Sequence, residues 1–261
     1  MQYGVTIPDT VAPHTLVELA QEAERAGWDG FFYWDTGLID PWVVLTAVAM
    51  RTSHLRLGTM VTPLPRQQPW KVASEVATLD VLSNGRVILP VGLGVIDFER
   101  MGITKDYKIR AKMLDEELEI LDHLWSGEPF SYQGTYYQIE ETTGPRPAQK
   151  PRIPIWVVGG SKNSQIRRAA RWDGVMIHST AAEIRERKAV IEQQRTSATP
   201  LEIITEGETP GDDPEQAASA VHALAEAGVT WWLEAVWNTP REKGGLEGMR
   251  TRIKQGPPRI S

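Results

Sequence analysis

A glycine pair followed by a hydroxyl residue and a lysine is the stretch of this sequence best suited to hold an anion. In the segment VVGGSKNS, Gly159 and Gly160 end an apolar run, and Ser161 precedes a helical pattern. The first backbone N–H groups of a helix lack internal partners, and the helix dipole makes that end positive. A phosphate at this turn would meet oriented donors and the Ser161 hydroxyl. The alternative is that the glycines only make a tight turn between strand and helix.

Four acidic or imidazole side chains fall at the ends of other apolar runs. They are Asp35, His178, Glu206 and Glu234. Carboxylates and imidazole are suitable ligands for a divalent cation, so a metal-dependent isomerase or hydrolase is one alternative for this chain. Carboxylates at loop starts also serve as helix caps or remain solvated. No lysine lies at a strand end, which argues against Schiff-base chemistry.

Tryptophan is frequent in this sequence, with 10 residues, and its positions suggest two different roles. Trp34, Trp42 and Trp237 lie at or beyond the ends of apolar runs and could form an aromatic wall around a small substrate. Trp231 and Trp232 are neighbours within one run. If that run is a strand, one indole faces the interior of the sheet structure and the other faces the covering helices.

Strand-like and helix-like runs alternate along the whole chain, which predicts a (β/α)8 TIM barrel as a single domain over residues 1–261. The expected strands are residues 3–7, 30–34, 56–62, 87–93, 155–158, 174–178, 201–205 and 230–236. The expected helices are residues 14–26, 70–82, 111–125, 163–172, 182–194, 214–227 and 242–254, with another beginning at residue 41. Residues 127–154 form an excursion between the fourth helix and the fifth strand. The site of such a barrel lies at the C-terminal ends of its strands.

Composition excludes several classes of function. The chain has no cysteine, so it has no disulfide, thiolate metal site or catalytic thiol. Its formal net charge of −6 argues against a nucleic-acid partner. No apolar run approaches about 18 residues, and the opening MQYGVTIPD has no signal-peptide pattern. The sequence therefore predicts a cytoplasmic protein without a membrane span.

Residues 57–102 carry a family resemblance. LGTMVTP, a helix ending in ATLDVLSNGRV, and the turn Gly92-Leu93-Gly94 resemble the luciferase-like flavin and F420-dependent oxidoreductases, the superfamily of the bacterial luciferase-like monooxygenases. PRIPIWVVGGS followed by RRAARWDG resembles the family's fifth strand and the next helix. The resemblance implies a barrel that binds the tricyclic ring of F420 or FMN over its mouth.

The same resemblance assigns residues to the cofactor. A bulge at Met60–Val61, often with a non-proline cis peptide, would support the ring, and its phosphate-bearing tail would pass the glycine pair. The implied cofactor-binding residues are Asp35, Thr36, Met60, Val61, Thr62, Leu93, Gly94, Val158, Gly159, Gly160 and Ser161.

One strand end departs from the family pattern. Members commonly have Asp-His after the second strand, whereas this chain has Asp35-Thr36. Asp35 could accept a hydrogen bond from the ring or its ribityl chain, but Thr36 cannot be a general base at neutral pH. An acidic residue that some deazaflavin enzymes carry after the fourth strand is replaced by Val95. His178 and Glu234 are then the catalytic candidates at strand ends.

These observations predict hydride transfer to or from F420, or oxygen activation by reduced FMN, on a small apolar or aromatic molecule. They favour F420, because no obvious base is present to manage a flavin peroxide. A separate flavin or F420 reductase is a possible partner, and the family's frequent pairing through barrel helices suggests a homodimer. A flavin-binding barrel without catalysis is the remaining alternative.

Overall fold

The computed structural model describes residues 1–94, 102–197, 199–236 and 245–260. Its barrel strands are β1 (Gln2–Ile7), β2 (Gly30–Tyr33), β3 (Arg56–Thr59), β4 (Thr62–Pro63), β5 (Leu89–Gly92), β8 (Ile155–Val158), β9 (Gly174–Met176), β10 (Glu202–Gly207) and β11 (Trp231–Glu234). The helices are α1 (Pro13–Arg25), α2 (Pro41–Ala49), α3 (Pro69–Leu82), α4 (Tyr107–Ser126), α5 (Asn163–Arg171), α6 (Ala181–Gln194), α7 (Pro214–Glu226) and α8 (Gly245–Lys254), with a 3₁₀ turn, η1 (Leu64–Arg66). Within the described ranges, no helix is long and apolar enough to cross a bilayer.

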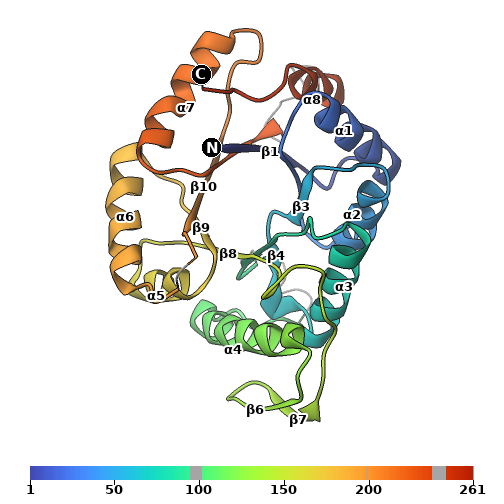
Figure 1. Cartoon of the computed structure of the whole chain (residues 1–261), viewed down its shortest axis with the longest axis vertical. Coiled ribbons are helices and arrows are strands. Elements are labelled where there is room, and N and C mark those ends of the chain that lie inside the picture. The colour runs from blue at the N-terminus through green and yellow to red at the C-terminus, as the bar shows by residue number, and fades with distance from the viewer. Residues whose placement is uncertain (95–101, 198, 237–244, 261) are drawn as a thin grey trace.

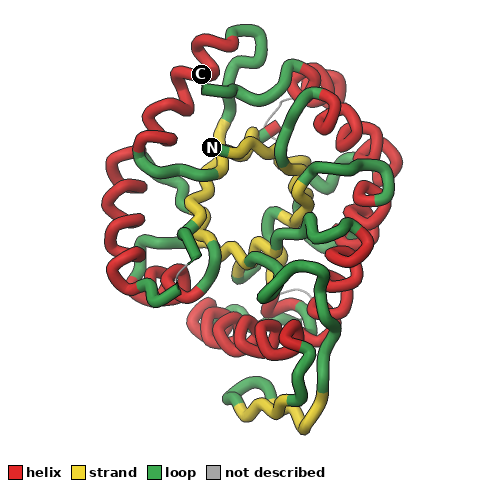
Figure 2. Tube along the Cα trace, viewed as in Figure 1, coloured by secondary structure: helices red, strands yellow, loops and turns green. Residues whose placement is uncertain are grey.

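The strands form a ring that the helices surround (Figures 1 and 2). All neighbours pair in parallel in the order β3-β2-β1-β11-β10-β9-β8-β5-β4. A parallel bridge between Leu57 and Val87 brings β3 against the segment before β5 and so closes the ring. The predicted (β/α)8 barrel is confirmed.

The expected strand over residues 56–62 is interrupted. β3 pairs with β2, and β4 pairs with β5, because the chain leaves the ladder at Met60 and Val61 between them. The Met60–Val61 peptide bond is cis, as the family resemblance implied. The two short strands together occupy one of the eight strand positions, so the irregularity changes the wall of the barrel and not its topology.

Aromatic rings fill the barrel interior. Phe32 stacks on Trp156 with centroids 5.4 Å apart, and Trp231 meets both rings edge-on at 5.9 and 5.3 Å. The indole N–H groups of Trp156 and Trp231 donate to Glu202 at 2.6 and 3.2 Å. Trp232 packs outside with the helices, so the predicted alternation of the two tryptophans is confirmed. The filled interior leaves the mouth of the barrel as the place for a ligand.

The excursion contains an antiparallel hairpin, β6 (Phe130–Gln133) and β7 (Gln138–Thr142), which lies beside α4 and outside the barrel (Figure 1). Glu116 on α4 accepts the backbone N–H groups of residues 135, 136 and 137 at 2.8, 2.9 and 3.2 Å. One helix carboxylate therefore fixes the turn of the hairpin.

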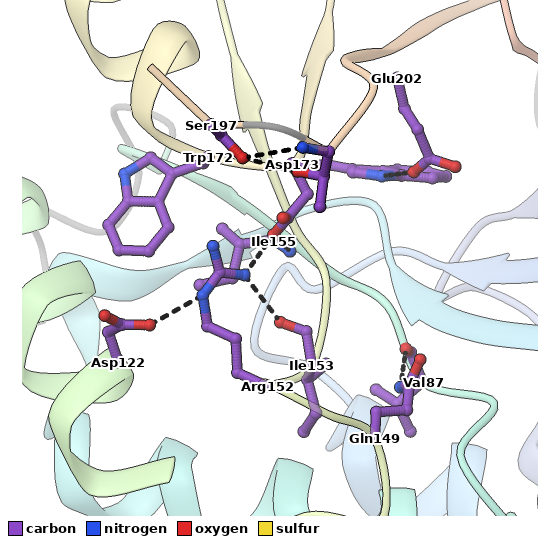
Figure 3. A network of polar contacts seen from close by, with 12 residues as sticks. Val87, Asp122, Gln149, Arg152, Ile153, Ile155, Trp172, Asp173, Ser197 and Glu202 are labelled. Carbon is purple, nitrogen blue, oxygen red and sulfur yellow. Dashed lines mark hydrogen bonds and ion pairs between the residues drawn. The ribbon is translucent and has the colours of Figure 1, made fainter. Parts of the chain in front are cut away.

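Arg152 fixes the end of the excursion where the chain re-enters the barrel (Figure 3). Its Nε lies 2.8 Å from Oδ1 of Asp122 on α4, and its Nη1 pairs with Asp173 before β9. Its guanidinium also lies 5.0 Å from the centroid of the Trp172 ring. These contacts join α4, the start of β8 and the α5–β9 connection, and so hold the two helices that border the site.

Candidate functional site

A cavity of about 780 Å³ lies at the C-terminal ends of β2, β4, β5 and β8 and reaches between the first turns of α4 and α5. It brings together eight of the residues predicted from the sequence, namely Trp34, Asp35, Thr36, Met60, Val61, Leu93, Gly94 and Val158. It also includes Lys162 and Arg168, which the sequence places near the glycine turn, and residues that sequence reasoning did not assign, among them Pro63, Tyr107, Lys108, Ala111, Leu114, Ser164 and Gln165. One side of the cavity is apolar and the other carries cationic groups.

The apolar wall is formed around the interrupted strand. Met60 and Val61 face the cavity across the cis peptide. The Thr62 hydroxyl lies 2.7 Å from that of Thr59, and both side chains are buried. Thr62 therefore lies behind the wall and stabilises it, although the sequence placed it beside the cofactor. Gly92 allows this packing, because a Cβ there would come within 2.7 Å of Val61 Cγ2.

Asp35 is buried at the border of this cavity and a smaller one of about 270 Å³. Oδ1 pairs with Arg66 of η1, and the Gln67 side chain donates to Oδ2 at 3.4 Å. Burial raises the pKa of Asp35, and the Arg66 guanidinium limits that rise. Trp42 lines the smaller cavity and is 3% exposed. The predicted aromatic wall is therefore divided, with Trp34 in the large cavity. Trp237 lies outside the described residues, as does Val95.

Thr36 lines the large cavity and its hydroxyl donates to the carboxylate of Asp9. Asp9 follows β1 and is 5% exposed. The pKa of Tyr33 is raised to about 12 by its burial and by the negative charge of Asp9. Sequence reasoning missed Asp9, although it ends the segment TIPD at the first strand end. The signal that could have found it was its position in that segment, because parallel neighbours β1 and β2 end side by side.

The glycine turn after β8 presents three donors to one acceptor. The backbone N–H of Ser161, the hydroxyl of Ser161 and the backbone N–H of Lys162 lie 3.3, 3.2 and 3.1 Å from Oε1 of Gln165. Gly159 and Gly160 have φ of 131° and 123°. A Cβ on Gly159 would come within 2.6 Å of the Gln165 side chain. The predicted residues Gly159, Gly160 and Ser161 do not themselves line the cavity, and a Cβ on Gly160 would face Ile177. Gln165, which sequence reasoning missed, connects the turn to the cavity.

Cationic side chains lie where α4 and α5 approach each other. Arg168 of α5 forms a two-pronged pair with Asp115 of α4, at 2.6 and 3.0 Å, and this pair joins the helices. Lys108 and Lys162 line the cavity on the first turn of α4 and at the N-cap of α5. Among the described residues, neither ammonium group has a carboxylate within ion-pair distance. The cleft between the two helices therefore favours anions.

The candidate catalytic histidine lies on another part of the mouth. His178 follows β9, and its Nε2 is 3.3 Å from Oε1 of Glu206 on the neighbouring strand β10. The His178 side chain is 53% exposed and is not part of the cavity lining. The imidazole is therefore accessible from solvent, whereas the Glu206 carboxylate, whose side chain is 16% exposed, lies behind it.

Glu234 is placed differently, at the corner between β11 and α8. Oε1 accepts the Thr209 N–H at 2.7 Å, and Oε2 accepts the Thr209 hydroxyl at 2.7 Å and the Trp232 indole at 3.0 Å. Arg252 of α8 pairs with the same carboxylate at 3.2 Å. The side chain is 2% exposed and lies on the helix-facing side with Trp232. This arrangement gives Glu234 a structural role away from the cavity.

The structure does not bring the four metal-ligand candidates together. Among the described residues no group of three or more acidic or imidazole side chains could hold a metal ion. Asp35 is paired with Arg66, and Glu234 faces the helices. The metal-dependent alternative therefore loses its ligand set within the part of the chain that is described.

The family assignment follows from a comparison with known proteins. The family model described as luciferase-like monooxygenase matches residues 1–249. This chain belongs to the luciferase-like monooxygenase family. Its relatives include the oxygenase component of a flavin-dependent trigonelline monooxygenase from Acinetobacter baylyi, 34% identical over an alignment of 158 residues that covers 57% of this chain and 44% of that protein. An F420-dependent glucose-6-phosphate dehydrogenase from Segniliparus rotundus is 35% identical over an alignment of 162 residues that covers 57% of this chain and 48% of that protein.

This luciferase-like chain spans about half the length of the curated relatives it matches. Among solved structures, the monooxygenase RslO1 from Streptomyces bottropensis has a TM-score of 0.82 at 19% identity, over 98% of this chain and 97% of that one. The coenzyme F420 dependent tetrahydromethanopterin reductase from Methanopyrus kandleri has a TM-score of 0.80 at 17% identity, over 97% and 96% of the two chains. At these identities the likeness shows the fold.

Proposed function

We propose that this luciferase-like protein is an F420-dependent oxidoreductase that moves a hydride between the deazaflavin and a small apolar or aromatic molecule. The observation that carries the proposal is the cavity itself, in which an apolar wall at the barrel mouth continues into a cationic cleft. A planar ring with an anionic tail has this distribution of chemistry. Bound F420 supplies a carbon centre that accepts or gives a hydride.

The residues present fit such a cofactor. Met60, Val61 and Leu93 offer an apolar surface for a ring. The three donors that converge on Gln165 at 3.1–3.3 Å would satisfy a phosphate oxygen equally well, because a charged acceptor binds N–H and O–H donors more strongly than an amide oxygen does. In this proposal the phosphate replaces the Gln165 carboxamide at the first turn of α5.

Charge in the cleft favours F420 over FMN. The tail of F420 continues beyond its phosphate into glutamate carboxylates, whereas FMN ends at its phosphate. Lys108 and Lys162 extend the positive region across the cleft from α5 to α4. Two ammonium groups without a carboxylate partner among the described residues match the longer anionic tail.

The protein's own groups would orient the ring and the substrate and exclude water. In this proposal Asp35, whose side chain is buried and paired with Arg66, would lie beside the edge of the ring at the border of the cavity. Trp34 would contact an apolar substrate. His178, with Glu206 behind it, is the accessible group that could exchange a proton with solvent at the mouth.

The decisive experiment titrates the purified protein with F420 and with FMN, each oxidised and reduced, and follows absorbance and fluorescence. We expect micromolar binding of F420 and weaker binding of FMN. Binding of neither cofactor would overturn the proposal. Binding of F420 without turnover of any hydride donor or acceptor would identify a non-catalytic cofactor-binding barrel.

A flavin-dependent monooxygenase is the second candidate, and the similarity to the trigonelline oxygenase component supports it. Preference for reduced FMN in the titration would favour this function. Such an enzyme needs a separate reductase to supply reduced flavin. Oxygen consumption that depends on an added flavin reductase would establish it.

We also propose that the chain pairs with a second copy of itself through α2 and α3, which pack side by side on one flank of the barrel (Figure 1). Val43 is 69% exposed, Met50 63%, Trp70 50% and Val81 52%. Large apolar side chains on adjacent helices suit a self-complementary contact.

Val43→Glu with Met50→Glu should convert a dimer to a monomer in light scattering. Leu246→Glu on α8, which is 40% exposed, is the control and should not. A monomeric wild type would contradict this proposal.

A further inference from the structure

The pair formed by Thr36 and Asp9 has a feature that neither residue has alone. Asp9 is a carboxylate without a hydrogen to donate, so the Thr36 hydroxyl must give its single hydrogen to Asp9. The Thr36 oxygen then has only acceptor capacity left. Thr36 lines the large cavity, whereas Asp9 is 5% exposed and lies behind it.

The neighbours of Asp9 do not change this direction. Tyr33 lies within electrostatic reach, and its hydroxyl makes no hydrogen bond to the residues that the structure describes. Asp35 also feels the charge of Asp9, but it is bound to Arg66 on its other side. Among the described residues, the Thr36 hydroxyl is thus the side-chain group that donates a hydrogen bond to Asp9.

We infer that Thr36 and Asp9 form a specificity subsite that selects a substrate carrying an alcohol O–H group. The inference rests on the proposed function, because the subsite borders the cavity assigned there to the cofactor and its substrate. An alcohol donates to the Thr36 oxygen, whereas an ether, aldehyde or ketone oxygen would place a second acceptor against it. A site built to bind a substrate hydroxyl discriminates strongly against the analogue that lacks it.

Asp9 acts here as a positioning residue, because it touches Thr36 and fixes the direction of the hydroxyl. The substitution Asp9→Asn would remove the fixed direction of the Thr36 hydroxyl. The new amide can donate to the Thr36 oxygen, so the Thr36 hydrogen becomes free to turn into the cavity. The subsite would then accept donors and acceptors alike.

The test compares two probes, benzyl alcohol and benzyl methyl ether, on protein saturated with the cofactor that the titration selects. Binding is followed by the fluorescence of the bound cofactor and by ligand-observed NMR. We expect the alcohol to bind about tenfold more tightly than the ether, which is the value of one hydrogen bond of about 1.4 kcal/mol. An equal affinity, or no binding of either probe, would overturn the inference.

Three variants separate this role from a purely structural one. Thr36→Ser keeps the hydroxyl and should keep the preference, whereas Thr36→Val should abolish it. Asp9→Asn should reduce the preference to about twofold or less, since its amide allows both orientations of Thr36. A preference retained in Asp9→Asn would show that Asp9 does not orient the hydroxyl. If no cofactor binds, the proposed function fails, whereas normal cofactor binding with no probe preference defeats only this inference.

Discussion

Two clusters of polar groups lie at the C-terminal ends of the barrel strands, and they differ in how easily their hydrogen-bonding groups could exchange one partner for another. At the β11 corner, Glu234 is held by Thr209, Trp232 and Arg252, and each partner belongs to the folded frame. At the β8 turn, the donors of Ser161 and Lys162 converge on the side chain of Gln165, at the edge of the cavity.

This difference separates a structural cluster from a binding site. Moving Glu234 out of its cluster would leave the Arg252 guanidinium without its carboxylate partner, in a side chain that is only 12% exposed. Moving Gln165 strands no charge, and an arriving anion would replace its oxygen. Donors that are hydrogen-bonded to one movable neutral side chain are therefore available to a ligand. Donors that are hydrogen-bonded to a carboxylate in a buried ion pair are not.

The largest effect is expected from Glu234→Leu. The substitution leaves Arg252 buried without its carboxylate and should lower the free energy of unfolding by about 3–5 kcal/mol. Urea denaturation measures it. Glu128→Leu removes an exposed pair with Arg146 and is the control, with an expected change below about 1 kcal/mol. A Glu234→Leu protein that stays stable but loses activity would instead support the catalytic role that the sequence suggested.

Gly159→Ala tests the other cluster. Its Cβ would lie within 2.6–2.9 Å of the Gln165 side chain, in the space assigned to the phosphate, so cofactor affinity should fall at least about tenfold. Gly160→Ala is the matched control, because it shares a positive φ while its Cβ meets Ile177 at an ordinary 3.4 Å. Equal losses in both variants would mean that backbone strain, and not the phosphate site, explains the effect.

The barrel could be predicted from sequence because each element carries a local pattern. The run LRLGTMVT predicts a strand over residues 56–62, but the break at Met60–Val61 arises from tertiary pairing. On one side the backbone carbonyl of Tyr33 accepts the Met60 N–H at 2.8 Å, while on the other side β4 pairs with β5. No window of the sequence contains both neighbours, so the split was not predictable from periodicity.

The site was predictable where its residues are backbone features and not where side-chain direction decides. The turn after β8 could be predicted from Gly159 and Gly160, whereas its role in binding an anion stays a prediction. Glu234 and His178 both lie at strand ends, yet one faces the helices and the other the mouth. Asp9 and Gln165 were missed because their importance depends on the groups they meet, Thr36 and the Ser161 turn.

Reversing one charge sharpens the picture of the cationic cleft. Lys108→Glu should weaken F420 binding about fivefold at low salt, with a smaller loss at high salt because the interaction is electrostatic. Lys112 lies one turn further along α4 and outside the cavity lining, so Lys112→Glu is the control. FMN should be affected less than F420. Equal losses for both cofactors would place Lys108 at the shared phosphate, and no loss would remove it from the site.

The smallest effect concerns Asp35, which stands between the two kinds of cluster because its side chain is fully buried and paired with Arg66, although the residue borders the cavity. Burial raises its pKa, so between the ordinary and the raised value the folded chain holds a proton that the unfolded chain has lost. The free energy of unfolding should therefore fall as pH rises through that interval and level off above it. Asp35→Asn removes this contribution, whereas Asp212→Asn, at an exposed position, should leave it unchanged. Urea midpoints from acid to neutral pH measure the difference between wild type and variant. A difference that is constant with pH would show that Arg66 fully offsets the burial of Asp35, and would place this residue with the closed, structural cluster.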